Sequence, residues 1–386
     1  MNKIITALVL FFAVSMIAPN AQAVPQWANR YGMNCNHCHI SNAWPRLNRM
    51  GYEFKLRGYR FDFEKKEISN PLDVVSLVYK FTNTQTKSAG KDWQGKTAYE
   101  EYDMFATVNF GDKSQWAAFS EIRPNEAFRS AFGLQRHARW FKAGNLTYTG
   151  GNEKSTYQIR TGRLPQVRGS MFMGNDRYPT PRNFIQNESV QGHKFGQNYG
   201  LGFEAVNTWN MRDTVRFFAM RVDEVEPFND AQTYGGAYQH LFGGGNTSFG
   251  ATYIHSDQPH RASGLEAKVD RAYVTASLDV NPKLLVLGGV AGGSSRDIVG
   301  VRRTDLGCFA EANYFPVSSL TLALRYDEID KDWNSLMPKR GVQADVFYSL
   351  FSNGAFDFRA FAGFGHVFNA GNQNKKVVKT GVTATF

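Results

Sequence analysis

Cysteine is scarce in this chain, with only three among 386 residues. Cys35 and Cys38 stand three positions apart, which leaves Cys308 without a cysteine partner. No second Cys/His pair follows Cys35 and Cys38 at finger spacing, so a zinc finger is excluded. We expect Cys308 to be a small apolar side chain on a strand.

Long apolar runs are also missing. After residue 23, no stretch approaches the roughly 18 apolar residues of a membrane-spanning helix. Residues 1–23 have the pattern of a secretory signal, in which Lys3 gives the charged start and Ala21-Gln22-Ala23 the cleavage site. The formal charge is +10, yet no basic helix or basic run with interleaved aromatics occurs. We therefore expect export and no nucleic-acid partner.

The pattern that is present is Cys35-Asn36-His37-Cys38-His39. C-x-x-C-H is the spacing of covalent c-type haem attachment. Two thiols on one helical turn can each form a thioether with a haem vinyl group, and the adjacent histidine falls under the iron. The sequence thus predicts one covalent haem c, held by Cys35 and Cys38, with His39 as the proximal iron ligand. A chance Cys-x-x-Cys pair or a disulfide is the alternative.

Residues 24–70 form the predicted haem segment. Leu47, Met50 and Phe54 recur at helical spacing and share one face. Met50 is our first choice as the distal iron ligand, although it can also pack against the porphyrin. The other candidates are His137, His193, His240 and His255. The segment also contains five basic residues, Arg46, Arg49, Lys55, Arg57 and Arg60. We expect them to bind the haem propionates, carboxylates of the barrel or a periplasmic partner.

From residue 71 to 386 the period changes to two. Tyr102, Met104, Ala106, Val108 and Phe110 alternate with Asp103, Phe105, Thr107 and Asn109, as in a half-buried strand. We count about sixteen such runs, each near the roughly 9–11 residues that cross a membrane obliquely. Short turns alternate with longer polar connections, and the chain has 36 glycines and 14% aromatic residues. This combination predicts an all-β transmembrane antiparallel barrel in a bacterial outer membrane rather than a soluble sandwich.

An even strand number puts both ends of the barrel on the periplasmic side, where the haem segment begins. The segment is under fifty residues, about the lower limit for an independent core, so we expect it in or against the barrel lumen. For the long connection 165–197 three roles are open: a plug inside the lumen, a cover of the outer mouth, or a surface loop without a role. Acidic clusters at 223–230 and 327–332 either attract divalent cations or are solvated loop charge.

The segment before the haem pattern reads Ala23-Val24-Pro25-Gln26-Trp27-Ala28-Asn29-Arg30-Tyr31-Gly32-Met33-Asn34. Over Ala23 to Tyr59 it resembles the fused monohaem cytochrome–porins of bacterial outer membranes, of the iron(II)-oxidising type. Pro25, Ala28, Tyr31, Gly32 and the C-x-x-C-H pattern match that family. Three positions depart from it, because Trp27 replaces Phe, Asn29 replaces Arg and Arg30 replaces Gln or Lys. The resemblance implies a haem in or against a barrel lumen and leaves the iron substrate open.

Together these observations predict an electron conduit. An extracellular donor, first of all Fe(II), would reduce the haem, and a periplasmic c-type cytochrome would reoxidise it. The protein would then be an Fe(II):cytochrome c oxidoreductase embedded in outer-membrane lipid. The alternatives are a diffusion porin with a tethered cytochrome module, electron transfer with a donor or acceptor other than iron, and a haem enzyme such as a peroxidase.

Overall fold

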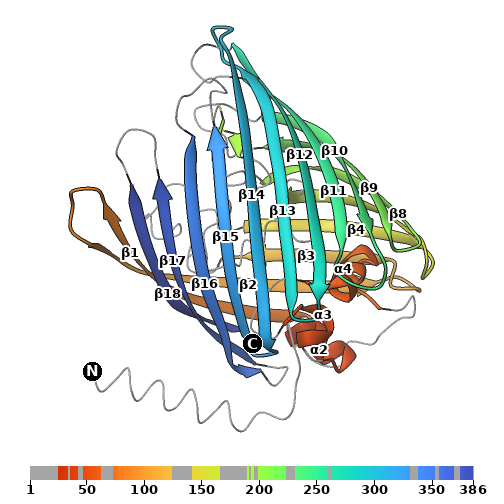
Figure 1. The fold of residues 1–386 in the computed structure, drawn as a ribbon. Coiled ribbons are helices and arrows are strands. Elements are labelled where there is room, and N and C mark those ends of the chain that lie inside the picture. Colours follow the sequence, from red (N-terminus) through yellow and green to blue (C-terminus); the bar gives the residue numbers. More distant parts are fainter. Residues whose placement is uncertain are drawn as a thin grey trace, which may run out of the picture.

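A computed structural model describes residues 25–33, 35–41, 47–61, 73–123, 141–165, 189–190, 193–194, 199–222, 231–259, 263, 265–330, 338–352, 356–368 and 374–385. Within these ranges, three short helices precede sixteen strands that close into one antiparallel barrel (Figure 1). The helices are α2 (Pro25–Tyr31), α3 (Cys35–Cys38) and α4 (Arg49–Leu56).

The barrel strands follow the order of the sequence, and β1 pairs with β18 to complete the ring. They are β1 (Val75–Ser88), β2 (Gln94–Phe110), β3 (Trp116–Ile122), β4 (Phe141–Gly151), β5 (Thr156–Pro165), β8 (Tyr199–Trp209), β9 (Asp213–Val222), β10 (Ala231–Leu241), β11 (Ser248–Pro259), β12 (Glu266–Asn281), β13 (Leu284–Arg296), β14 (Arg302–Val317), β15 (Leu320–Asp330), β16 (Lys339–Ser352), β17 (Asp357–Phe368) and β18 (Lys375–Thr385). A separate two-stranded sheet, β6 (Ser189–Val190) and β7 (His193–Lys194), lies in the connection between β5 and β8.

The predicted strand number is confirmed, and so is the alternation along each strand. Large apolar side chains face outward, as with Leu201 at 67% exposure and Phe217 at 62%. Thr107 and Thr321, which face inward, are fully buried. Exposing so much apolar surface is unfavourable in water and favourable in a bilayer. The closed ring also pairs every strand on both sides, so that no unpaired backbone edge faces the lipid.

Aromatic side chains stack on the outer face near the short-turn end. Phe110 stacks on Trp116 (ring centroids 6.3 Å apart), and Trp116 packs edge-on against Tyr148 at 4.9 Å. Tyr157 continues the row at 6.1 Å from Tyr148. Such aromatic girdles mark the level of the lipid headgroups in outer-membrane barrels.

The interior is not uniformly polar. An apolar cluster of fifteen buried residues fills part of it, and most of its members come from β9 to β17. The members include Leu285, Phe309, Phe315, Phe347 and Phe361. This cluster differs from the expectation for a porin-type barrel, whose inward positions are polar. Among the described residues, no helix is long and apolar enough to span a membrane.

Candidate functional site

The N-terminal helices lie at the end of the barrel that carries the short turns (Figure 1). Side chains of α2, of α4 and of the connection between α3 and α4 reach inward-facing residues of widely separated strands. The contacts are Gln26 to Thr107 of β2 (3.3 Å), Tyr52 to Gln239 of β10 (2.9 Å) and Ser41 to Thr321 of β15 (2.9 Å). Because these strands lie far apart around the ring, the segment extends across the mouth of the barrel.

The C-x-x-C-H pattern occupies α3 and the residue after it. Positions 35 and 38 are the first and last residues of this single helical turn, and His39 follows directly. His39 is half-buried and forms an isolated antiparallel bridge with Leu47. The side chain of Cys35 lies outside the described part of the chain, whereas that of Cys38 is half-buried. The structure thus places the predicted attachment positions on one turn, as the chemistry of the donor set requires.

Asn48 joins this turn to the next helix. Its side-chain oxygen accepts a hydrogen bond from the Gly51 backbone N–H (3.0 Å) and so caps α4. Its amide nitrogen donates to the last carbonyls of the turn, those of Asn36 (3.1 Å), His37 (3.0 Å) and His39 (3.2 Å). The last carbonyls of a helix in general lack a donor from the helix itself. One side chain therefore serves both helix ends.

Gly51 permits the close approach of α4 to α3. A Cβ atom built at this position would lie 2.3 Å from the Cys38 carbonyl oxygen, which is closer than any real contact. The buried residues of α4 are Gly51, Tyr52, Phe54 and Leu56. Met50 is 46% exposed, because the barrel covers only part of the helical face that Met50 shares with Phe54. Its role as a distal ligand stays a prediction.

A covalent haem fits the residues that are present. The chemistry of the donor set is complete on α3, with two thiol positions one turn apart and a histidine next to them. Beside it, Ile40 packs against the apolar cluster of the lumen. Cys35 and Cys38 would hold the porphyrin and His39 its iron.

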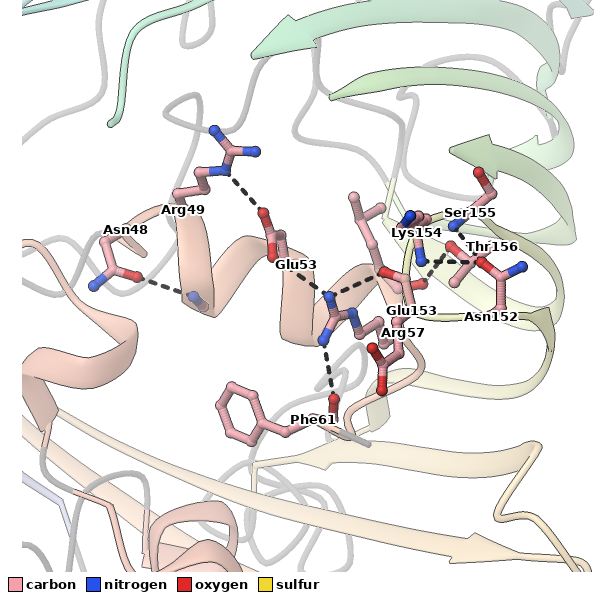
Figure 2. Close-up of polar contacts among 12 residues, drawn as sticks. Asn48, Arg49, Glu53, Arg57, Phe61, Asn152, Glu153, Lys154, Ser155 and Thr156 are labelled. Carbon is pink, nitrogen blue, oxygen red and sulfur yellow. Dashed lines mark hydrogen bonds and ion pairs between the residues drawn. The ribbon is translucent and has the colours of Figure 1, made fainter. Parts of the chain in front are cut away.

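Three arginines, Arg49, Arg57 and Arg60, tie the segment to the barrel turns. Figure 2 shows the contacts of Arg57 with Glu153 and Phe61 and the contact of Arg49 with Glu53. Arg49 donates to the Gly243 carbonyl in the β10–β11 turn, and its Nε lies 2.8 Å from Glu53. Arg57 donates to the carbonyls of Phe61 (2.9 Å) and Glu153 (3.2 Å), the latter in the β4–β5 turn.

Arg60 is the most buried of the three, at 1% exposure. It donates to the carbonyls of Arg57 (3.0 Å), Thr149 (3.1 Å) and Lys113, the last in the β2–β3 turn. Backbone carbonyls, rather than the predicted carboxylates of the barrel wall, are thus the observed barrel contacts of Arg49, Arg57 and Arg60. Arg46 lies outside the described residues.

A polar network continues from α4 into the wall. The Tyr52 hydroxyl accepts from Arg216 Nη2 (2.9 Å) and donates to Gln239. Arg216 and Arg160 both pair with buried Glu204, at 3.4 and 3.1 Å. Buried charges need such partners, so the position of α4 is coupled to the charge arrangement of β5, β8 and β9.

An aromatic cluster fills the space between the helices and strands β2 and β3. Trp27 stacks on Tyr59 (centroids 5.0 Å apart, planes 11° apart), and Tyr59 stacks on Phe119 of β3 (5.8 Å, 13°). Phe54 and Phe61 pack against each other at 4.6 Å. Such contacts bury large apolar area and hold the helices against the wall.

Two of the four alternative histidine ligands, His240 and His255, face away from the lumen. His240 follows inward-facing Gln239, so it faces outward, where its Nδ1 lies 2.7 Å from Asp213. His255 also faces outward and hydrogen-bonds to Asp270 (2.7 Å). These two predictions are wrong, because neighbouring residues of a strand point to opposite faces. His137 and the side chain of His193 lie outside the described residues.

The acidic cluster at 327–332 is divided between the two faces of β15. Asp327 faces the lumen and accepts from Arg325 Nε (2.7 Å). Glu328 faces outward and pairs with Arg340 (3.3 Å). In the described part of the chain, no group of three or more His, Cys, Asp or Glu could hold a metal ion. The cluster at 223–230, Asp332, most of the 165–197 connection, the predicted signal and Phe386 lie outside the described residues.

Solved outer-membrane porins share this fold. Similar structures include an anion-selective porin from Comamonas acidovorans (12% identity, TM-score 0.60, covering 81% of this chain and 98% of that one). OmpT of Vibrio cholerae, folded in vitro, is 9% identical with a TM-score of 0.56 (81% and 97%). OmpF of Salmonella typhi in complex with daunomycin is 14% identical with a TM-score of 0.54 (81% and 97%). No family model and no curated protein matches this chain.

These likenesses establish the fold alone, a sixteen-stranded barrel of the kind found in bacterial outer membranes. The apolar outer face and its aromatic row are the physical grounds for assigning the chain to such a membrane. The predicted localisation is thus confirmed, and the predicted architecture is confirmed as far as the barrel.

Proposed function

We propose that this barrel is an electron conduit of the bacterial outer membrane. One covalent haem c, attached at Cys35 and Cys38 and ligated by His39, would pass electrons between an extracellular donor, first of all Fe(II), and a periplasmic c-type cytochrome. The observation that carries the proposal is the C-x-x-C-H turn in the mouth of a porin-type barrel. The resemblance of residues 23–59 to fused cytochrome–porins supports the same assignment.

A bilayer does not conduct electrons, and a hydrated cation or a mineral outside the cell cannot reach a periplasmic carrier. A barrel wall encloses a protein-filled route through the insulator. When bound, the haem supplies one-electron redox chemistry, and the iron would be held by His39 on one side, with Met50 as the distal candidate.

The chain's own residues contribute position and exclusion. Arg49, Arg57 and Arg60 fix the segment to three turns at the same end. Ile40, which follows His39, packs against the apolar lumen cluster, so apolar side chains would border one side of the redox centre and exclude water there. A segment held across the mouth also restricts the passage of solutes while electrons cross.

The first test asks whether the chain carries haem and which cysteines hold it. We expect the purified protein to give a haemochrome spectrum that denaturation and extraction do not remove, and Cys35→Ala with Cys38→Ala to abolish it. Cys308→Ala is the matched control, because Cys308 lies on β14, away from α3, and its removal should leave the haem content unchanged. Haem-free wild-type protein would overturn the proposal.

The second test asks about the donor. Fe(II) added to the oxidised holoprotein in lipid vesicles should produce the bands of ferrous haem, and a periplasmic-type cytochrome c should then reverse the change. Failure of Fe(II) to reduce the haem at any pH, together with reduction by another donor, would keep the conduit and remove iron as its donor.

A diffusion porin with a tethered cytochrome is the second candidate, and the shared fold with solved porins favours it. Conductance in a planar bilayer separates the two. The conduit predicts small currents from the full chain, because the segment crosses the mouth. Steady porin-sized conductance from the intact protein would support the second candidate instead.

A further inference from the structure

Arg30 is a buried arginine with one edge of its guanidinium group left without a partner. The residue lies on α2 and is 9% exposed. Its Nη1 donates to Asn109 Oδ1 of β2 at 2.7 Å, whereas Nε and Nη2 are buried and make no hydrogen bond. Nε and Nη2 form the pair of parallel N–H donors that binds both oxygens of a carboxylate or phosphate.

Two neighbours on the same helix also have unpartnered polar atoms. Trp27 Nε1 and Gln26 Oε1 are buried without a hydrogen bond. These residues precede Arg30 by three and four positions, so all three lie on one face of α2. Gln26 Nε2 donates to Thr107 Oγ1 at 3.3 Å, and turning the amide over would let the hydroxyl donate to Oε1 and free Nε2 as a further donor. The face therefore offers N–H groups suited to an oxyanion.

The charge of Arg30 is incompletely balanced. Burial lowers the pKa of Arg30, and the nearby Tyr31 and Asp73 only partly offset this effect. Asp73 is the acid that acts on it, yet neither Nε nor Nη2 hydrogen-bonds to the Asp73 carboxylate. A buried cation is unfavourable unless a counterion pairs with it, so the site is suited to an added negative group.

The other arginines of the segment are already committed. Arg60 uses all three guanidinium nitrogens on backbone carbonyls, and Arg57 uses both terminal nitrogens. Arg49 binds Glu53 and the Gly243 carbonyl. Of these four arginines, Arg30 alone keeps a paired donor edge open, and only residues 32–34 separate α2 from the attachment turn.

Building on the proposed function, we infer that Arg30, assisted by Trp27 and Gln26, binds a propionate carboxylate of the haem attached at Cys35 and Cys38. A free oxyanion such as phosphate offers the same chemistry, and the experiment below distinguishes the two sources. Arg30 would then place the haem edge against β2 and neutralise one of its carboxylates.

The test compares reduction potentials of holoproteins. Removing a positive charge beside the haem, and exposing an unpaired propionate, stabilises the ferric form. We expect Arg30→Gln to lower the ferrous-to-ferric ratio at a fixed electrode potential about tenfold, which corresponds to ~59 mV for one electron. Arg30→Lys keeps the charge but lacks the paired edge, and it should lower the ratio by a smaller factor.

Arg212→Gln is the matched control, because Arg212 is exposed in the β8–β9 turn at the same end of the barrel. It should leave the ratio within about twofold, since exposed charges are screened by salt. Haem content and heat-modifiable gel mobility are checked first. If Arg30→Gln does not fold, Arg30→Lys alone still tests the paired edge.

Three outcomes would overturn the inference while leaving the conduit intact. The first is an unchanged potential in both Arg30 variants. The second is a shift in Asp73→Asn of the same size as that in Arg30→Gln and of opposite sign, which would make Asp73 the partner of Arg30. The third is a potential that depends on added phosphate in the wild-type protein and not in Arg30→Gln. Wild-type protein without covalent haem would instead remove the proposed function itself, and this inference with it.

Discussion

At the scale of single residues, Asn48 connects the turn that contains Cys35 and Cys38 to the start of α4. It caps α4 with its oxygen and binds three carbonyls of the preceding turn with its nitrogen. Asn48→Ala removes both functions, and the cap alone contributes about 1 kcal/mol. We expect hydrogen exchange at residues 48–52 to accelerate about fivefold or more.

Asn48→Ser separates the two functions of this side chain. Serine keeps an oxygen for the cap and loses the amide donors. Exchange at the start of α4 should then remain near wild type, while protection in the turn at 36–39 falls. Equal acceleration at both places in the serine variant would mean that the cap is not formed by this side chain.

Gly51 gives a second residue-scale prediction. Alanine favours helices over glycine by about 1 kcal/mol, so Gly51→Ala would stabilise an isolated α4. Here its Cβ would overlap the Cys38 carbonyl oxygen at 2.3 Å and approach Leu47 at 3.0 Å. Overpacking against backbone costs about 1–3 kcal/mol.

The overlap should therefore dominate, and limited proteolysis should cut the helical segment faster than in wild type. Gly95→Ala, which meets nothing within 4 Å, is the control and should leave the rate unchanged. Slower cleavage of Gly51→Ala would show that α4 does not pack against α3 this closely.

Some residues of the site were predictable and others were not. Cys35, Cys38 and His39 can be proposed as haem-binding residues from the sequence alone, because thioether chemistry requires a fixed local spacing. Arg30 was not singled out, because its open edge arises from burial against Asn109, seventy-nine positions away. Met50 shared a helical face with Phe54 in the sequence, yet the two differ in exposure because the barrel covers only part of that face.

At the scale of elements, the helical segment and the barrel turns are connected by Arg60. Its guanidinium binds the Lys113, Thr149 and Arg57 carbonyls from a position almost without solvent contact. Arg60→Ala should loosen the segment and raise the single-channel conductance and the frequency of large openings in a planar bilayer. Arg340→Ala is the control and should leave both quantities unchanged, because Arg340 forms an exposed pair with Glu328 at the opposite end of the barrel. Unchanged currents in Arg60→Ala would mean that Arg60 does not hold the mouth closed.

Strand existence was predictable from periodicity, because lipid and lumen impose opposite polarity on alternate positions. The positions at which the strands end were less predictable. β14 continues through Pro316 to Val317, although proline commonly marks a turn, and the turn follows Val317. The pairing register of β14 with β15 shifts between Tyr314 and Val317, a bulge that accommodates a proline without an N–H. The apolar lumen cluster was missed because a hydrophobic inward residue has no local signature.

At the scale of the whole molecule, the outer wall makes a quantitative prediction about lipid. Val290 lies at the middle of β13, faces outward and is 51% exposed. Arginine near the bilayer midplane costs about 2–4 kcal/mol, but only about 0–1 near the interface. Val290→Arg should therefore reduce the free energy of folding into lipid vesicles far more than Leu284→Arg at the strand end. Urea titrations in vesicles provide the measurement, and equal losses would place Val290 away from the midplane.

The pairing of β1 with β18 has a consequence for biogenesis. The ring is completed by the first and last strands to be synthesised, and the helices immediately precede the first. Before β1 and β18 pair, the helical segment can enter through the open side of the wall, whereas after pairing it can enter only through an end of the barrel. Under the proposed function, attachment of the haem and docking of the segment would therefore precede the closure of the ring, and a barrel that closed first would exclude the segment from its mouth.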